Sequence, residues 1–226
     1  MSGSLTNPRD ALSGPIGDSS PDSWGCGLIR KAWSGELTEL DYLLAVDDIA
    51  REGSLRYFDD DGMPLARTHP PTPCPNELRE LRGLASAAGT CRQMTASDRD
   101  RLLGSAGSLG GTRPKASIRY EDGELAIAKV TLDDHTMPVE RAEVATLNLA
   151  RAEGIDAAST RLEVNDTNRP AALIKRFNRS QGERISYLSA QSFAGAGAAT
   201  GRYSTDIADG LRAHASNPRQ QMSELN

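Results

Sequence analysis

Length, composition and charge narrow the classes of protein to which this chain can belong. Its 226 residues are enough for one large domain or two small ones, and the 38% hydrophobic and 4% aromatic content predicts a mainly aliphatic core. A formal net charge of −5 argues against a general nucleic-acid-binding surface, although a local basic patch stays compatible with it.

The N-terminus, the apolar runs and the cysteines predict the cellular location of the chain. The N-terminus has no apolar segment typical of a secretory signal, and no apolar run approaches the roughly 20 residues that a membrane-spanning helix needs. The three cysteines, Cys26, Cys74 and Cys91, are odd in number and have no C-x-x-C spacing. The sequence therefore predicts neither a disulfide framework nor a zinc site, and a reducing cytoplasm is the expected location.

The first half of the chain predicts a mostly helical region. Residues 1–21 are rich in Ser, Gly, Pro and Asp and predict an irregular tail. Thr38 and Asp41 form a capping box at the start of a second predicted helix, which we expect to run to Gly53. The other expected elements are a helix in PDSWGCGLIRKAWSG, a short strand and turn in SLRYFDDDGMPLA, an extended connector in THPPTPCP, and helices in NELRELRGLASAAG and TASDRDRLL.

Beyond a glycine-rich stretch at 104–111 the hydrophobic period changes to that of strands. KASIRY and ELAIAKV, joined by Asp122-Gly123, predict a β-hairpin. PVERAEVATLNLARAEG predicts a helix that begins at Pro138 and ends at Gly154. The remaining expected elements are strands in STRLEV and PAALIKRF and two helices in SYLSAQSFAG and STDIADGLRAHA.

The glycine-rich stretch by itself is a weak signal. It matches neither G-x-x-x-x-G-K-[ST] nor G-x-G-x-x-G, and it precedes a strand rather than a helix. A loop of this kind covers nucleotide phosphates in kinases, and it also suits a flexible linker between two halves of a chain.

A lysine and a glutamate in the next two elements make a sharper pattern. Strand alternation places Lys129 on the same face as Leu125 and Ile127, so its ammonium needs an anion or access to water. Glu143 interrupts an apolar helix stripe whose other members are Val139, Leu147 and Ala150. Kinases use a strand lysine held by a glutamate of the following helix to bind nucleotide phosphates. The alternatives are a solvated edge strand for Lys129 and a surface pair with Arg151 for Glu143.

Several blocks together give the chain a resemblance to a known family. From about residue 20 onward it resembles the bacterial HipA-type serine/threonine kinases, which are the toxins of toxin–antitoxin pairs. The blocks that carry the resemblance are SPDSWG, LTELDYLLAVDD, REGSLRY, GSLGGTRPKA, AIAKV, VERAEVATLNLARAEGI, ALIKRFNR and RISYLSA, in the order of the family.

The resemblance implies an α+β fold. The expected layout is a partial N-terminal subdomain at 22–104, a kinase-like small lobe with an antiparallel sheet and one helix at 105–180, and the start of a large lobe at 181–226. It also implies ATP and Mg²⁺ as cofactors and a helix-turn-helix antitoxin repressor as a possible partner, with no direct nucleic-acid binding.

The same resemblance assigns site residues. Ser108 falls at the place of a regulatory phosphorylated serine, and Asn178 stands where the family usually has an aspartate near the ribose. The implied ATP-binding residues are Gly110, Gly111, Thr112, Arg113, Pro114, Lys115, Lys129, Glu143, Lys175, Arg176 and Phe177, of which the last three match the adenine-binding hinge. The simpler readings are solvated loop charges for Arg113 and Lys115 and an ordinary core position for Phe177.

The groups that complete phosphoryl transfer are not found. Neither D-x-x-x-x-N nor D-F-G occurs after Lys129, and Asp166, Asp206 and Asp209 suit a turn or a solvated helix face. We therefore expect no catalytic or Mg²⁺-binding residue in this chain, which resembles a truncated member that is inactive alone. A nucleotide-free module that binds the antitoxin or complements another chain, and an active kinase with an unrecognised catalytic group, stay open as alternatives.

Overall fold

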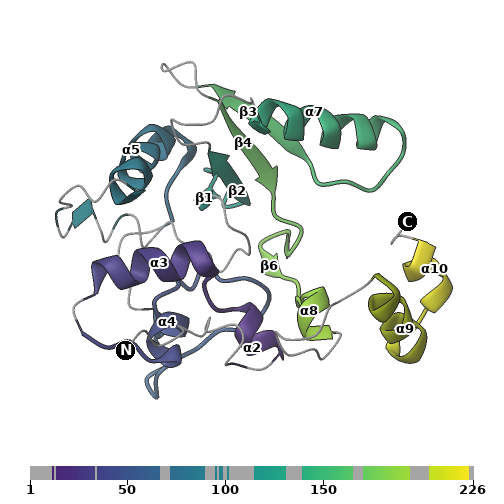
Figure 1. The fold of residues 1–226 in the computed structure, drawn as a ribbon, viewed down its shortest axis with the longest axis horizontal. Coiled ribbons are helices and arrows are strands. Elements are labelled where there is room, and N and C mark those ends of the chain that lie inside the picture. Colours follow the sequence, from purple (N-terminus) through teal and green to yellow (C-terminus); the bar gives the residue numbers. More distant parts are fainter. Residues whose placement is uncertain are drawn as a thin grey trace.

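The fold is α+β and is built around one antiparallel sheet. The computed structural model describes residues 12, 14–33, 35–66, 72–89, 95, 97–98, 101, 115–130, 139–164, 170–193 and 204–223. In the view of Figure 1, the sheet and two helices form one side of the molecule, helices α2, α3 and α4 form another, and α9 and α10 lie apart near the C-terminus. None of the described helices combines the length and apolarity that crossing a bilayer requires.

The sheet forms from the alternating segments that the sequence predicts. Its four strands lie in the order β1-β2-β4-β3, with every neighbouring pair antiparallel. The predicted hairpin is confirmed, and Gly123 of its turn has a φ of 84°, a conformation that glycine adopts without steric cost. The strand bounds are Lys115–Arg119 for β1, Leu125–Val130 for β2, Thr160–Val164 for β3 and Pro170–Lys175 for β4.

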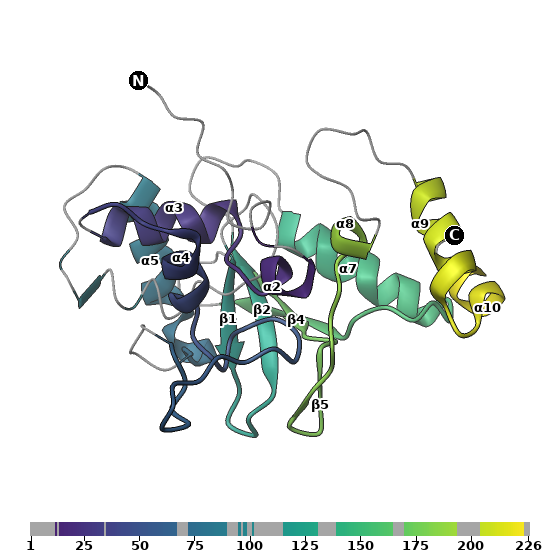
Figure 2. The same cartoon turned by 90° about the horizontal axis from the view of Figure 1, so that it is seen from below.

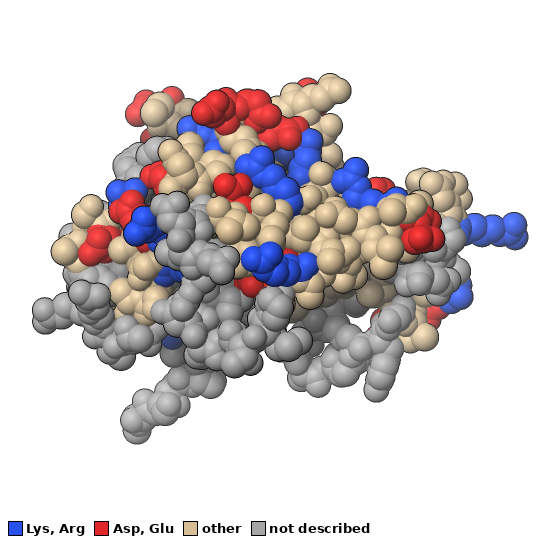
Figure 3. Space-filling model, turned by 90° about the horizontal axis from the view of Figure 1, so that it is seen from above, with Lys and Arg blue, Asp and Glu red and all other residues tan. Residues whose placement is uncertain are grey.

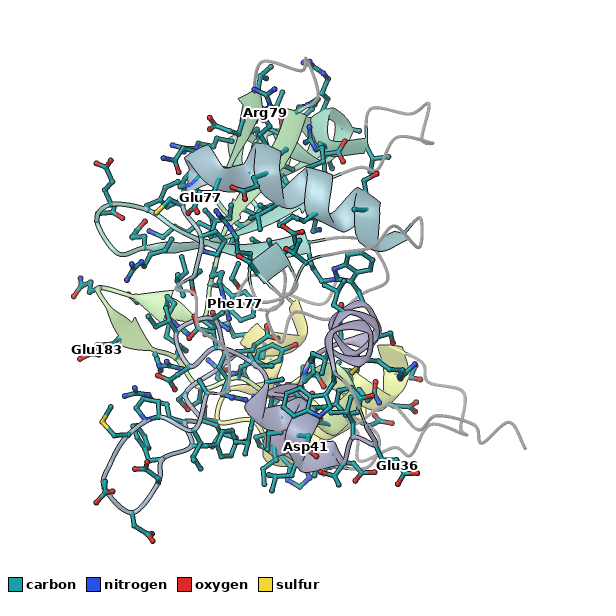
Figure 4. The ribbon with its side chains drawn as sticks, turned by 90° about the vertical axis from the view of Figure 1, so that its left-hand side faces the viewer. Glu36, Asp41, Glu77, Arg79, Phe177 and Glu183 are labelled. Carbon is teal, nitrogen blue, oxygen red and sulfur yellow. The ribbon has the colours of Figure 1, made fainter. Side chains whose placement is uncertain are left out.

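Two helices cover opposite faces of this sheet. Helix α5 (Leu78–Gly89), preceded by the short 3-10 helix η1 (Pro75–Glu77), lies across one face of the sheet, as Figure 4 shows from the side. Its Leu78 belongs to a buried cluster on that face. The other members of that cluster are Ile118, Ala128, Ala171 and Leu173, with Tyr120 and Val130 at its edge. Helix α7 (Val139–Ala152) packs on β3 and β4 and contacts Lys129, whose side chain lies on the other face because strand residues alternate.

The first half of the chain forms a second, smaller core. Helix α3 (Ser23–Ala32) begins at Asp22, whose Oδ1 accepts a hydrogen bond from the Gly25 backbone N–H at 2.7 Å. This core is made by Cys26, Leu28, Ile29, Tyr42 and Ala45, with Trp24, Leu37 and Leu84 packed against it. Leu84 belongs to α5, so the two cores touch through that helix.

The second predicted helix is shorter than expected. Its capping box between Thr38 and Asp41 is confirmed, but α4 (Glu39–Leu44) ends nine residues before the expected stop at Gly53. Several of the backbone carbonyls that follow accept hydrogen bonds from arginine side chains, and the guanidinium of Arg51 donates to the carbonyl of Val46 at 3.0 Å. One helical turn remains, in which the Arg51 backbone N–H donates to the carbonyl of Asp47 at 2.9 Å. Tertiary contacts thus override the local helical preference.

Part of the predicted irregular tail is folded. Residues Gly14–Asp18 form α2, and Ser19 and Ser20 after it are fully buried. Asp18 accepts a hydrogen bond from the backbone N–H of Ser189 at 2.7 Å, and the hydroxyl groups of Ser19 and Tyr57 lie 2.9 Å apart. The composition of this segment predicts disorder because it carries little apolar surface, whereas polar contacts to distant residues order it.

The last part of the chain contains small elements. The remaining bounds are Arg179–Ser180 for β5, Glu183–Arg184 for β6, Ala190–Phe193 for α8, Ser204–His214 for α9 and Pro218–Ser223 for α10. The last of these helices, α10, was not predicted from the sequence. Strands β5 and β6 form a hairpin that projects from the body of the molecule, as Figure 2 shows from below. Helices α9 and α10 pack on each other, and the Phe193 ring of α8 meets His214 of α9 edge to face.

Candidate functional site

Two lysines lie side by side on the sheet face toward which α7 is packed. In the antiparallel register of β1 and β2, Lys115 is directly opposite Lys129. Side chains of directly opposite residues point to the same face and have Cβ atoms about 4.5–5.5 Å apart. Like charges directly opposite each other are destabilising, so negatively charged groups near these two lysines stabilise this face of the sheet.

One anion comes from α7. The ammonium of Lys129 donates a hydrogen bond to Oε1 of Glu143, and the two groups form an ion pair. The expected meeting of these two side chains is confirmed, as is the partly buried helix stripe on which Glu143 lies. The pair is not enclosed in a dry cleft, because 38% of the Lys129 side chain and 26% of the Glu143 side chain are exposed. Water therefore screens this pair and reaches its ammonium.

The other anion comes from the start of α3. Oδ2 of Asp22 lies 2.9 Å from Nζ of Lys115, and these side chains are only 4% and 8% exposed. Although the distance is that of an ion pair, Oδ2 accepts no hydrogen bond from the described residues. Asp22 thus has two tasks, since its other oxygen caps α3. Sequence analysis missed it because no local pattern relates Asp22 to a strand more than 90 residues later.

Most of the predicted phosphate loop lies outside the described residues. This applies to Gly110, Gly111, Thr112, Arg113 and Pro114, and also to Ser108, the predicted phosphorylation site. Lys115, the last predicted residue of the loop, is the first residue of β1. Its reading as a solvated loop charge is wrong, because its side chain is buried against Asp22.

The predicted hinge begins at Lys175, the last residue of β4. The backbone N–H of Lys175 donates to the carbonyl of Ser159 at 2.8 Å, and that of Arg176 donates to the carbonyl of Leu125 at 3.0 Å. Phe177 is 65% exposed and its ring centroid lies 5.7 Å from that of Tyr187, so it is not an ordinary core residue. Figure 4 places Phe177 where the sheet meets the N-terminal helices. Contact of these residues with adenine stays a prediction.

The side chain of Arg176 has a structural role that sequence analysis did not find. It is 2% exposed, and its guanidinium donates to the carbonyls of Ala50 and Arg51, to Ser117 Oγ and to Asn178 Oδ1. Burial lowers its pKa to about 10. The Arg176 side chain therefore fastens the segment after α4 to the sheet.

Neighbouring arginines complete this attachment. Arg179 donates to the carbonyls of Ile49, Arg51 and Gly53. Burial, followed by the charge of Arg176, lowers the pKa of Arg179 to about 9. Asp48 accepts hydrogen bonds from Arg56 and Arg184, with the shortest contact 2.6 Å from the Arg56 guanidinium. The segment after α4, which the sequence predicts as helix, is therefore kept in a non-helical conformation by hydrogen bonds from four guanidinium groups. They belong to Arg56, Arg176, Arg179 and Arg184.

Two grooves lie away from the lysine pair. One of about 820 Å³ is on the face that α5 covers and is lined by residues that include Tyr120, Arg161 and Leu173. Another of about 610 Å³ lies between the β1–β2 turn and the β5–β6 hairpin. Acidic and basic side chains occur together on the face shown in Figure 3, so no single sign of charge marks it as a binding surface. Within the described ranges, no three His, Cys, Asp or Glu side chains gather as a metal-binding group.

Comparison with known proteins identifies the second half of the chain. No curated protein matches it. A family model does match, and its range, residues 107–226, contains both lysines, Glu143 and the hinge. The match spans more than half of the 226 residues. The chain therefore belongs to the family defined by the HipA-like C-terminal domain.

Proposed function

We propose that this chain binds the phosphates of ATP on the sheet face that carries Lys115 and Lys129, as part of a HipA-type serine/threonine kinase. The observation that carries the proposal is the opposition of these lysines across β1 and β2, with Glu143 of α7 holding the more exposed one. An ammonium fixed by a helix carboxylate is the arrangement by which kinases position nucleotide phosphates. Membership of the HipA family supports this reading.

The location of the pair favours a polyanion as the ligand. Lys129 is exposed enough to be reached from solvent, and its neighbour on the same face adds a second positive charge. Two ammonium groups at opposite positions of neighbouring strands can each contact a different phosphate of a triphosphate. A single carboxylate is a poorer match for two separated positive charges. The predicted hinge lies at the end of β4, the strand next to β2, which is where the base of the nucleotide would lie.

The proposal assigns nucleotide binding, and not phosphoryl transfer, to these 226 residues. Transfer needs a group that positions the acceptor hydroxyl and ligands that hold Mg²⁺. The sequence after Lys129 contains neither D-x-x-x-x-N nor D-F-G. Phosphorylation of Ser108, which would add about 1.5–2 negative charges next to the phosphate site, is proposed on the resemblance alone.

Equilibrium dialysis with radiolabelled ATP tests the proposal. We expect saturable binding that Lys129→Ala weakens by roughly tenfold or more, because a hydrogen bond to a charged group contributes about 1.5–3 kcal/mol. Arg212→Gln is the matched control, since Arg212 is 58% exposed on α9 and its loss changes the net charge equally. Absence of binding, or equal binding by wild type and Lys129→Ala, would refute the phosphate site.

The same variant separates the alternative of a nucleotide-free interaction module. A module that docks a helix-turn-helix antitoxin or another chain through other surfaces would keep its partner after Lys129→Ala. Co-purification of both proteins with a candidate repressor gives that comparison. Equal recovery of the repressor, together with no ATP binding by wild type, would favour the interaction module.

A further inference from the structure

The two lysines of the proposed phosphate site differ in accessibility. The side chain of Lys129 is 38% exposed, whereas that of Lys115 is 8% exposed and faces Asp22. A phosphate reaches the ammonium of Lys129 from solvent. It reaches that of Lys115 only if the carboxylate of Asp22 or the start of α3 moves.

The contact between Asp22 and Lys115 is well suited to exchange. It is an ion pair at 2.9 Å in which Oδ2 accepts no hydrogen bond from the described residues, so the pairing is mainly coulombic. Because the pair is buried, Lys115 is left without this anion unless another one takes its place, so a competing polyanion has to supply that charge. A polyphosphate that already contacts Lys129 presents several charged oxygens next to the directly opposite Lys115.

We propose that Asp22 is a competing anion that occupies Lys115 until the phosphates of a bound nucleotide displace it. Displacement removes the ion pair between the Asp22 carboxylate and the sheet, and it keeps the cap of α3 through Oδ1. Nucleotide binding and the position of the α3 N-terminus are then coupled, and by linkage each changes the other to the same extent. This inference rests on the proposed nucleotide site and adds to it a route by which the helical half of the chain responds to occupancy.

The chain carries its own reporter of this movement. It has two tryptophans, Trp24 in the first turn of α3 and Trp33 at the end of the same helix. Trp24 is two residues from Asp22 and packs against the core of the N-terminal helices. Trp33→Phe therefore leaves a single tryptophan whose emission depends on the environment of the α3 N-terminus.

The first experiment titrates Trp33→Phe with ATP and, separately, with inorganic tripolyphosphate. Equilibrium dialysis of the same samples measures binding without reference to fluorescence. We expect both ligands to change the Trp24 emission with the half-saturation that dialysis gives. Binding by dialysis with an unchanged Trp24 emission would overturn the displacement of Asp22 and leave the proposed phosphate site standing. No binding by dialysis would refute the site itself, and the inference with it.

The second experiment removes only the competing charge. Asp22→Asn keeps an oxygen that caps α3, because asparagine is as good an N-cap as aspartate. We expect it to bind tripolyphosphate about fivefold more tightly or better, the lower end of typical coupling between sites. Asp60→Asn is the control, since Asp60 lies in an exposed turn outside the site and its loss changes the net charge equally.

The direction of this change distinguishes competition from a structural role. A residue that only maintains the fold would weaken binding when replaced. Circular dichroism at the temperature of the titration shows whether Asp22→Asn is folded, and a lower unfolding temperature is expected in either case because a buried pair is removed. Unchanged or weaker binding by folded Asp22→Asn would overturn the proposal. If the variant does not fold, the titration of Trp33→Phe decides, because it needs no change at Asp22.

Discussion

The two lysine–carboxylate pairs on the same sheet face should contribute very differently to stability. The Lys129–Glu143 pair is 38% and 26% exposed, and pairs screened by water typically contribute about 0–1 kcal/mol. The Lys115–Asp22 pair is 8% and 4% exposed, and removing one partner of a buried pair costs about 3–5 kcal/mol. Asp22→Asn should therefore lower the free energy of unfolding by at least ~3 kcal/mol, and Glu143→Gln by no more than ~1 kcal/mol.

Urea unfolding followed by circular dichroism measures both losses on the whole chain. For a chain of this size 1 kcal/mol corresponds to about 2–4 °C in Tm, so thermal unfolding should separate the variants by roughly 4 °C or more. Lys115→Met combined with Asp22→Asn removes the buried ammonium together with the carboxylate and should recover part of the loss. Equal losses for Asp22→Asn and Glu143→Gln, or a double variant no more stable than Asp22→Asn, would refute the assignment of burial and pairing.

Three further changes test contacts elsewhere in the molecule. Asn178→Asp should raise the free energy of unfolding by about 1–2 kcal/mol. The substitution removes the buried amide nitrogen of Asn178, which has no acceptor among the described residues, and gives the buried guanidinium of Arg176 a charged acceptor. A lower urea midpoint for this variant would contradict the prediction. Gln181→Asn should stabilise the β5–β6 turn by roughly 0.5–1 kcal/mol, because Gln181 has a φ of 50° and asparagine tolerates that region better. An unchanged Tm would count against strain there. Gly53→Ala should cost about 1–2 kcal/mol, because Gly53 has a φ of 72° and a new Cβ would lie 3.2 Å from Cβ of Tyr187; a variant as stable as wild type in urea would show that the segment adapts.

Which parts of the fold follow from the sequence depends on how local their determinants are. The β1–β2 hairpin and α7 are recognisable because period, turn residues and terminal signals all lie within about 20 residues. The Lys129–Glu143 pair also follows from sequence, because strand alternation and helix periodicity each place one member on a defined face.

The attachment of the N-terminal half to the sheet shows the opposite case. The segment 45–53 has helical periodicity, yet its carbonyls are bound by guanidinium groups of Arg176, Arg179 and Arg184 from more than 120 residues away. No local sequence pattern predicts hydrogen bonds between side chains and backbone carbonyls that are so far apart in the chain. The order found at 14–20 arises in the same way, from contacts to residues such as Ser189.

For the candidate site, the sequence by itself determined the strand lysine, the helix glutamate and the family resemblance, because these depend on short-range periodicity and on blocks of adjacent residues. Only the tertiary structure decided that Lys115 is directly opposite Lys129 and buried against Asp22. Strand register and the docking of α3 result from packing across the whole chain, and electrostatic contacts between distant residues exist only once that packing is complete.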